Sequence, residues 1–210
     1  MSKALTIEAI EASAIEVFCR DGFDRASLRE IAGQAGVALS AIHEYFDSKA
    51  DLYIHVGRRL FTRLEAKRRA ILEGFRASGE AIDLAKIIYC MVAPVVLPGT
   101  ADDRAWTPAR LRTWYDTTSY LGDYPAFRDE LRSTADSWIE LMLEHCPALG
   151  YAEGRFAHAL ISAVTFNWEM TNRYFTDALK MAGRHAPDEE CERVVRVIAA
   201  GIRDLSGRVG

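Results

Sequence analysis

The sequence predicts an all-α protein, because three observations agree along its 210 residues. Apolar residues recur at steps of three and four through long segments, which is the spacing of one buried helix face. Glycines, prolines and capping residues separate these segments. No segment shows the apolar–polar alternation that is typical of a half-buried β-strand. We therefore expect about nine helices and no sheet.

The N-terminal segment predicts two helices in succession. Residues 5–20 have an apolar face at helical spacing, and Gly22 stands where a helix C-cap is expected. Ser27 is a suitable N-cap for the next helix, and Glu30, three residues on, would complete a capping box. The apolar face of the first helix consists of Ile7, Ile10, Ala14, Val17 and Phe18.

The stretch from Leu28 to Tyr53 predicts two short helices around a sharp turn. Gly36 supplies the backbone freedom that the reversal needs. Two helices that cross through a short turn containing glycine form a helix-turn-helix, whose second helix can enter a DNA major groove. We therefore expect residues 1–48 to be a three-helix DNA-binding domain, called the head below. The buried faces on either side of the turn are Leu28, Ile31 and Ala32, then Val37, Ala41, Ile42 and Phe46.

Residues 49–210 predict a larger helical body for ligand binding and dimerisation. Ser48 repeats the capping pattern at the start of its first helix, and Pro94 should kink or end the second one. Glycine and proline mark the breaks between the helices. The expected ranges are 48–75, 80–96, 108–120, 126–144, 153–181 and 188–205.

The charge distribution excludes indiscriminate binding of nucleic acid over the whole surface, since the formal net charge is −4. Residues 1–50 hold five Lys and Arg against eight Asp and Glu, whereas residues 51–78 hold seven basic residues against three acidic ones. Any DNA contact must therefore be local. The basic run from Arg58 to Arg69 is more typical of a solvated helix face than of a phosphate track.

The sequence also argues against an exported protein and against an enzyme. The N-terminus lacks the apolar run of a signal peptide, and the longest apolar run, residues 87–97, is too short to span a bilayer. The four cysteines are scattered and have no metal-ligand spacing. No catalytic or nucleotide-binding motif occurs, and no Glu has a His three residues on. We expect a cytoplasmic protein with free thiols, no catalytic residues, no metal and no cofactor.

The first fifty residues resemble the tetracycline-repressor (TetR) family of transcriptional regulators. The matched positions occur at fixed spacing over about a quarter of the chain, which makes the resemblance far more specific than a lone helix-turn-helix pattern. They are the Phe18 to Gly22 helix end, Ala26-Ser27, Ile31-Ala32, Ala35-Gly36-Val37, Tyr45-Phe46 and Ser48-Lys49 followed by Leu52.

The resemblance implies roles at seven positions, six of them in the head and the seventh, Lys49, directly after it. Ser27 would donate to a phosphate, Leu39 and Ser40 would lie at base edges, and Lys49 would meet a phosphate at a helix start. Three positions depart from the family pattern. Ala38 replaces a capping Ser or Thr, His43 replaces a phosphate-binding Tyr, and Glu44 adds a negative charge that could accept from a cytosine. The expected set is Ser27, Ala38, Leu39, Ser40, His43, Glu44 and Lys49.

The resemblance further implies a palindromic double-stranded DNA operator, a homodimer and a small inducer, with no membrane partner. Such bodies enclose an apolar pocket, although aromatic residues at helical spacing are by default core residues. The candidate pocket, for a largely apolar or aromatic inducer, consists of Met91, Trp114, Tyr115, Trp138, Phe166, Met170 and Tyr174. The candidate dimer stripe, which could equally be buried on its own body, consists of Val194, Val197, Ile198, Ile202 and Leu205.

Two functions from different classes follow from this sequence. The first is a ligand-responsive DNA-binding regulator, most simply a repressor that its inducer releases from the operator. The second is a helical ligand-binding or adaptor protein whose head no longer binds DNA. The acidic head and Ala38 keep the second interpretation open.

Overall fold

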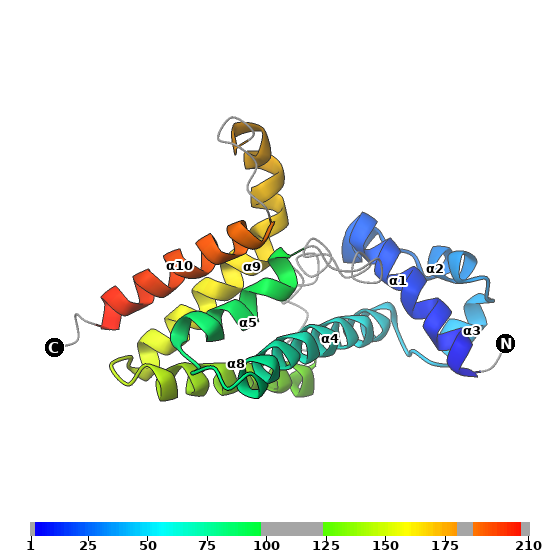
Figure 1. The fold of residues 1–210 in the computed structure, drawn as a ribbon. Helices are drawn as coiled ribbons and strands as arrows, with labels where there is room; N and C mark the ends of the chain where they lie inside the picture. The colour runs from blue at the N-terminus through cyan, green and yellow to red at the C-terminus, as the bar shows by residue number, and fades with distance from the viewer. Residues whose placement is uncertain (1–2, 98–123, 180–186, 207–210) are drawn as a thin grey trace. The chain divides into compact units, whose positions relative to one another are not determined.

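The computed structural model describes residues 3–97, 124–179 and 187–206, with the side chains of residues 166–179, 187 and 205–206 left out (Figure 1). These residues form eight helices and no strand, which confirms the all-α prediction. The expected helix over residues 108–120 lies outside the described residues. The helices are α1 (Lys3–Arg25), α2 (Leu28–Ala35), α3 (Leu39–His43), α4 (Lys49–Ala77), α5 (Leu84–Val96), α8 (Pro125–His145), α9 (Tyr151–Leu179) and α10 (Pro187–Ser206).

Local signals explain where several of these helices begin and bend. Gly22 has φ 74° and ψ 173°, so α1 is kinked there, and one last turn leads to Arg25. Ser48 Oγ accepts from the Asp51 backbone N–H at 3.0 Å, which confirms its role as a cap. Asp83 caps α5 by accepting from the Lys86 N–H, so this helix starts later than expected. It then continues past Pro94 to Val96.

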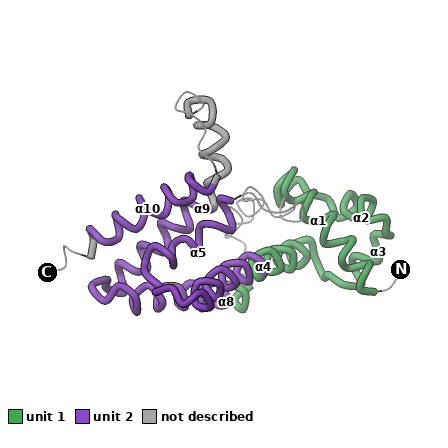
Figure 2. Tube along the Cα trace, viewed as in Figure 1, with its two compact units in different colours: residues 1–62, 109–127 green, residues 63–108, 128–210 purple. Residues whose placement is uncertain are grey.

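The chain divides into two compact units, coloured separately in Figure 2. Unit 1 comprises residues 1–62 and 109–127, and unit 2 comprises residues 63–108 and 128–210. The predicted head, residues 1–48, lies wholly in unit 1. Helix α4 contributes its first half to unit 1 and its second half to unit 2. The predicted domain boundary after residue 48 stays a prediction.

Unit 1 has a compact core in which α1, α2, α3 and the first turns of α4 meet. The Tyr53 ring on α4 lies edge-on to the rings of Phe18 and Phe23, with centroids 4.9 and 5.1 Å apart. Ile10 on α1, Ile31 on α2 and Ile42 on α3 are completely buried. The apolar faces read from the sequence therefore form one core.

A buried carboxylate ties α1 to α4 within unit 1. The Glu11 side chain is only 5% exposed, and it accepts from His55 Nε2 at 2.7 Å and from Arg59 Nη1. A buried carboxylate needs such partners, because an unpaired charge away from water is strongly unfavourable. Arg59, which the sequence places on a solvated basic face, thus pairs inside the unit.

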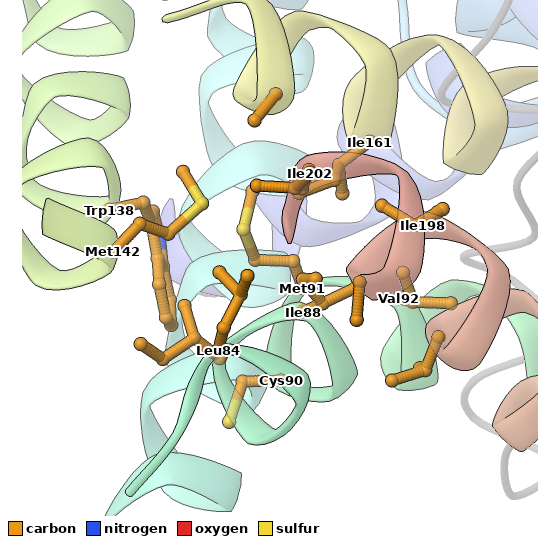
Figure 3. Close-up of a cluster of buried hydrophobic side chains, with 14 of the residues drawn as sticks. Leu84, Ile88, Cys90, Met91, Val92, Trp138, Met142, Ile161, Ile198 and Ile202 are labelled. Carbon is orange, nitrogen blue, oxygen red and sulfur yellow. The ribbon is translucent and has the colours of Figure 1, made fainter. Parts of the chain in front are cut away.

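Unit 2 is organised around α5, the most apolar helix in the described part of the chain, which packs against α9 and α10. Figure 3 shows Met91 and Ile88 of α5 between Trp138 of α8 and Ile198 of α10. All four side chains are at most 6% exposed. No helix within the described ranges combines the length and the apolar character needed to cross a membrane.

Candidate functional site

The reversal between α2 and α3 is made by Gly36, as the sequence predicts. Its backbone lies in the left-handed region at φ 68° and ψ 29°, and its N–H bonds the carbonyls at the end of α2. The Val37 N–H also returns to the Ala32 oxygen at 3.0 Å. A Cβ at Gly36 would meet nothing within 4 Å, so the requirement for glycine is conformational and not steric.

Helix α3 presents an exposed polar face beside this turn. Ile42 is the buried residue of the helix, whereas Ser40, His43 and the following Glu44 are exposed. Ala38 is the N-cap and makes no side-chain capping bond, and Leu39 is partly buried. A short helix anchored on one side and polar on the other is what a recognition helix requires.

Ser27 occupies the N-cap position of α2 with extended backbone, but the predicted capping box is wrong. The Ser27 side chain makes no capping hydrogen bond. Glu30 accepts instead from Arg20, which also donates to Asp21 and thereby lowers the pKa of that carboxyl. The Glu30 carboxylate binds the guanidinium more strongly than it would bind the Ser27 backbone N–H, because the first hydrogen bond is charge-assisted and water can satisfy the N–H. Ser27 remains exposed at the helix start.

Lys49 has structural partners in unit 1. Its Nζ donates to the carbonyls of Phe23, Asp24 and Ala26 at 2.7, 3.2 and 3.1 Å. It also lies 4.5 Å from the centroid of the Phe23 ring. An ammonium has three donors, and these carbonyls use all of them. The phosphate contact implied by the family resemblance stays a prediction, and it requires Lys49 to exchange one carbonyl for a phosphate.

The predicted pocket residues can be placed only in part. Met91 and Trp138 are fully buried in the core of unit 2. Trp114 and Tyr115 lie outside the described residues. Phe166, Met170 and Tyr174 belong to α9, where the description covers the backbone alone. The structure therefore brings together two of the seven candidates, and the pocket stays a prediction.

The predicted dimer stripe on α10 has two environments. Ile198 and Ile202 are buried in the core of unit 2, with Val194 packed against it, as the alternative interpretation expects. Val197 is 73% exposed, and the Leu205 side chain is outside the description. The neighbouring helix α9 also exposes Phe156 and Leu160, which the sequence analysis did not single out.

Unit 2 contains a buried polar cluster, Glu65, Arg68 and Trp138, that no motif in the sequence indicates. Arg68, assigned from its basic neighbours to a solvated face, is only 5% exposed, so that assignment is wrong. The spacing could have indicated this burial. Arg68 lies four residues after Leu64 and four before Leu72, so it shares the buried face of α4 with these two leucines. It donates to Glu65 at 2.6 Å and to the Met91 carbonyl at 3.2 Å. Glu65 in turn accepts from Trp138 Nε1 at 2.8 Å.

His158 on α9 belongs to the same surroundings. Burial, and next the positive charge of Arg68, lower its pKa from 6.5 to about 4. The folded protein thus keeps this ring neutral where an unfolded chain already binds a proton. A histidine with a lowered pKa contributes stability that is complete above about pH 6.5 and is lost as the pH falls toward 4.

Replacing His158 with glutamine should remove this pH dependence. Between about pH 7 and about pH 4.5 the wild type should lose about 2–3 kcal/mol of unfolding free energy relative to His158→Gln. Urea unfolding of both proteins across this range measures the difference, and it cancels the titrations that they share. An unchanged difference across the range would show that His158 titrates normally in the folded state.

Comparisons with known proteins agree with this geometry. Residues 10–56 match the profile of bacterial regulatory proteins of the tetR family. A transcriptional regulator from Rhodococcus sp. Rha1 is 20% identical with a TM-score of 0.64, over 93% of this chain and 95% of that one. A fatty acid degradation regulator from Bacillus halodurans is 18% identical with a TM-score of 0.62, over 93% of each chain. No curated protein matches the sequence.

A third solved structure extends the likeness to nearly the full length. A TetR-like transcriptional regulator from Rhodococcus sp. RHA1 is 18% identical with a TM-score of 0.58, over 99% of this chain and 100% of that one. At such identities the structures establish the fold. The Gly36 turn and the matched profile define residues 10–56 as a helix-turn-helix domain. Residues 10–56, which include most of the head, are thus similar to the DNA-binding part of the tetR family of bacterial regulatory proteins.

Proposed function

We propose that this protein is a cytoplasmic homodimer that binds a palindromic operator and releases it when a small molecule enters the body. Residues 1–48 act as the DNA-binding domain, and residues 49–210 bind the ligand and the second subunit. The observation that carries this proposal is the Gly36 turn, which holds a helix with one buried side chain and an exposed polar face. The predicted base-edge and phosphate positions on that face are exposed or partly buried.

Pairing inside the protein reduces the charge that unit 1 can offer to DNA. Arg20 is engaged by Asp21 and Glu30, and Arg59 by the buried Glu11. Phosphate contacts supply most of the non-specific affinity for DNA. The head should therefore bind non-specific DNA weakly and depend on its base contacts for a useful affinity. Weak non-specific binding also supports the alternative of a head that no longer binds DNA.

Selection from a random DNA pool, followed by electrophoretic shift at low and moderate salt, separates these two functions. A regulator should enrich a palindrome with two half-sites about one helical turn apart. The folded, dimeric protein is used without any added ligand. Failure to enrich a palindrome would leave the ligand-binding or adaptor function as the better account.

Replacing Glu44 with alanine should raise non-specific DNA affinity and relax base preference at one operator position. The exposed carboxylate repels phosphates and can accept from a cytosine amino group, so its loss should reduce discrimination there by about 1–3 kcal/mol. Glu144→Ala removes the same charge from an exposed site on α8 of unit 2 and should change neither property. Unchanged affinity and preference in Glu44→Ala would place Glu44 away from the groove.

Replacing Val197 with arginine should convert the dimer to monomer. Val197 is 73% exposed on α10, and Phe156 is 57% exposed on the adjacent α9, which is unusual for large apolar side chains. A buried, unpaired arginine should weaken association at least tenfold. Light scattering after size exclusion measures the mass. Leu5→Arg, a similar change at a site 55% exposed on α1, should stay dimeric, and a dimeric Val197→Arg would move the interface elsewhere.

A further inference from the structure

The Arg68 guanidinium has a buried donor that the described residues leave unsatisfied. Its Nε donates to the Met91 carbonyl and its Nη1 to Glu65, but Nη2 has no hydrogen-bond partner among them and no access to solvent. Buried polar groups are nearly always hydrogen-bonded, and a charged donor more so than a neutral one. Arg68 Nη2 is therefore a buried donor that an acceptor on a bound molecule would satisfy.

Glu65 cannot rotate to supply that acceptor. Its Oε1 accepts from Arg68 Nη1 at 2.6 Å, and its Oε2 accepts from Trp138 Nε1 at 2.8 Å. The Trp138 ring is itself fixed, because it is fully buried and the Arg69 guanidinium lies 4.6 Å from its centroid. Arg69 is held in turn by Ser137 Oγ at 2.5 Å. Glu65 is thus held by Arg68 through one oxygen and by Trp138 through the other. Arg68 Nη2 stays available to a different acceptor.

The surroundings of Nη2 favour a particular acceptor. Met91, whose carbonyl accepts from Arg68 Nε, and Trp138, which shares Glu65 with Arg68, are fully buried and apolar. His158 is held neutral, and the charged groups that act on it are Arg68 and Glu65 of α4, Asp136 of α8 and its own neighbour Arg155. Arg68 is the group here that combines burial with an unused donor. Nη2 offers two N–H groups of a single cation whose charge Glu65 already offsets in part, so a singly charged planar carboxylate suits it better than a doubly charged phosphate.

We propose that Arg68 Nη2 anchors the carboxylate of a small organic acid whose apolar body lies against Met91 and Trp138. This deepens the proposed function, on which it rests, by naming the chemical class of the effector. The carboxylate would form a charge-assisted hydrogen bond with Nη2, while the Glu65 pair keeps the guanidinium in place. The arrangement of few polar groups within apolar walls is that of small-molecule sites in general.

The test measures binding of defined acids and their neutral amides to the full chain, without DNA. The probes are straight-chain carboxylates from acetate to dodecanoate together with benzoate and phenylacetate, each paired with its amide. Calorimetry and the shift of the melting temperature report binding. At least one acid should bind, and its amide should bind at least tenfold more weakly. If no acid binds at millimolar concentration, or if acids and amides bind alike, Arg68 does not take a carboxylate.

Variants then assign the binding to Arg68. The double change Arg68→Met with Glu65→Gln removes both charges, so that no lone buried carboxylate is left, and it should lose acid binding at least tenfold. Arg76→Met is the matched control, because Arg76 pairs with Glu73 at the same spacing on the same helix but is 49% exposed. It should bind the acid as the wild type does. Acid binding that survives in the folded double variant would overturn the proposal.

The outcome for the effector stays separate from the outcome for DNA binding. The comparison of acid with amide uses wild-type protein, so it stands even if the double variant fails to fold. Operator selection uses protein without ligand. If an acid binds but no operator is enriched, the Arg68 site is supported and the regulator function is contradicted. If an operator is enriched but no acid binds, the regulator function is supported and the Arg68 site is contradicted.

Discussion

Replacing Trp138 with alanine should lower the free energy of unfolding by about 3–5 kcal/mol, the range observed for large aromatic side chains removed from well-packed cores. The Trp138 side chain is 0% exposed and stands between α5 and the polar cluster of α4. Its loss leaves a cavity and removes the only donor to Glu65 Oε2 that the described residues supply. Urea unfolding followed by circular dichroism measures the change.

Trp138→Phe is the control that separates packing from hydrogen bonding. Phenylalanine retains most of the apolar contact but cannot donate to Glu65, so its cost should be smaller, about 1–3 kcal/mol for an acceptor left without its donor. Equal losses in the two variants would mean that the Glu65 contact dominates. A loss below about 1 kcal/mol in Trp138→Ala would contradict the burial of the ring.

Replacing Ile42 with alanine should both destabilise unit 1 and abolish operator binding. Ile42 is 0% exposed and is the buried residue of α3, a helix of only five residues. So short a helix does not form by itself and depends on tertiary contacts. We expect a stability loss of about 2–5 kcal/mol and a fall in operator affinity of more than tenfold, because the helix loses its anchor.

Ser40→Ala is the matched change on the opposite face of α3. Ser40 is exposed, so the variant should unfold like the wild type, while operator affinity should fall if the hydroxyl reaches a base. Chemical unfolding and electrophoretic shift are measured on both variants. Full operator affinity in Ile42→Ala would show that α3 is held by other contacts, such as those of Phe46, which is 5% exposed.

Helix positions could be read from the sequence because their signals are local. Gly36 ends α2 and Ser48 caps α4 as predicted, since each acts within four residues of itself. The capping box at Glu30 failed because its competitor, Arg20, comes from another helix. A neighbour brought in by folding does not appear in a local pattern.

The candidate sites were less accessible to sequence reasoning for the same reason. The outward positions of α3 follow from helical period once Ile42 is placed in the core, so Ser40 and His43 could be expected to be exposed. The burial of Arg68 was not expected, because its basic neighbours in the sequence suggested an exposed face of α4. The hydrogen bonds of Lys49 could not be predicted either, because the carbonyls that accept from it at the α1–α2 junction are distant in the sequence and come close only in the folded chain.

The packing of α5 against α10 has a consequence for how the chain is made. The ribosome releases Leu84–Val96 long before Pro187–Ser206. Until α10 is synthesised, the apolar side chains of Ile87, Ile88 and Met91 therefore lack part of the core that buries them. Contacts between such distant segments close a long loop, which slows folding and prolongs the exposure of apolar surface. Unit 2 should therefore depend on chaperones during synthesis, whereas the local contacts of α1 with α2 and of α2 with α3 let the head fold as it emerges.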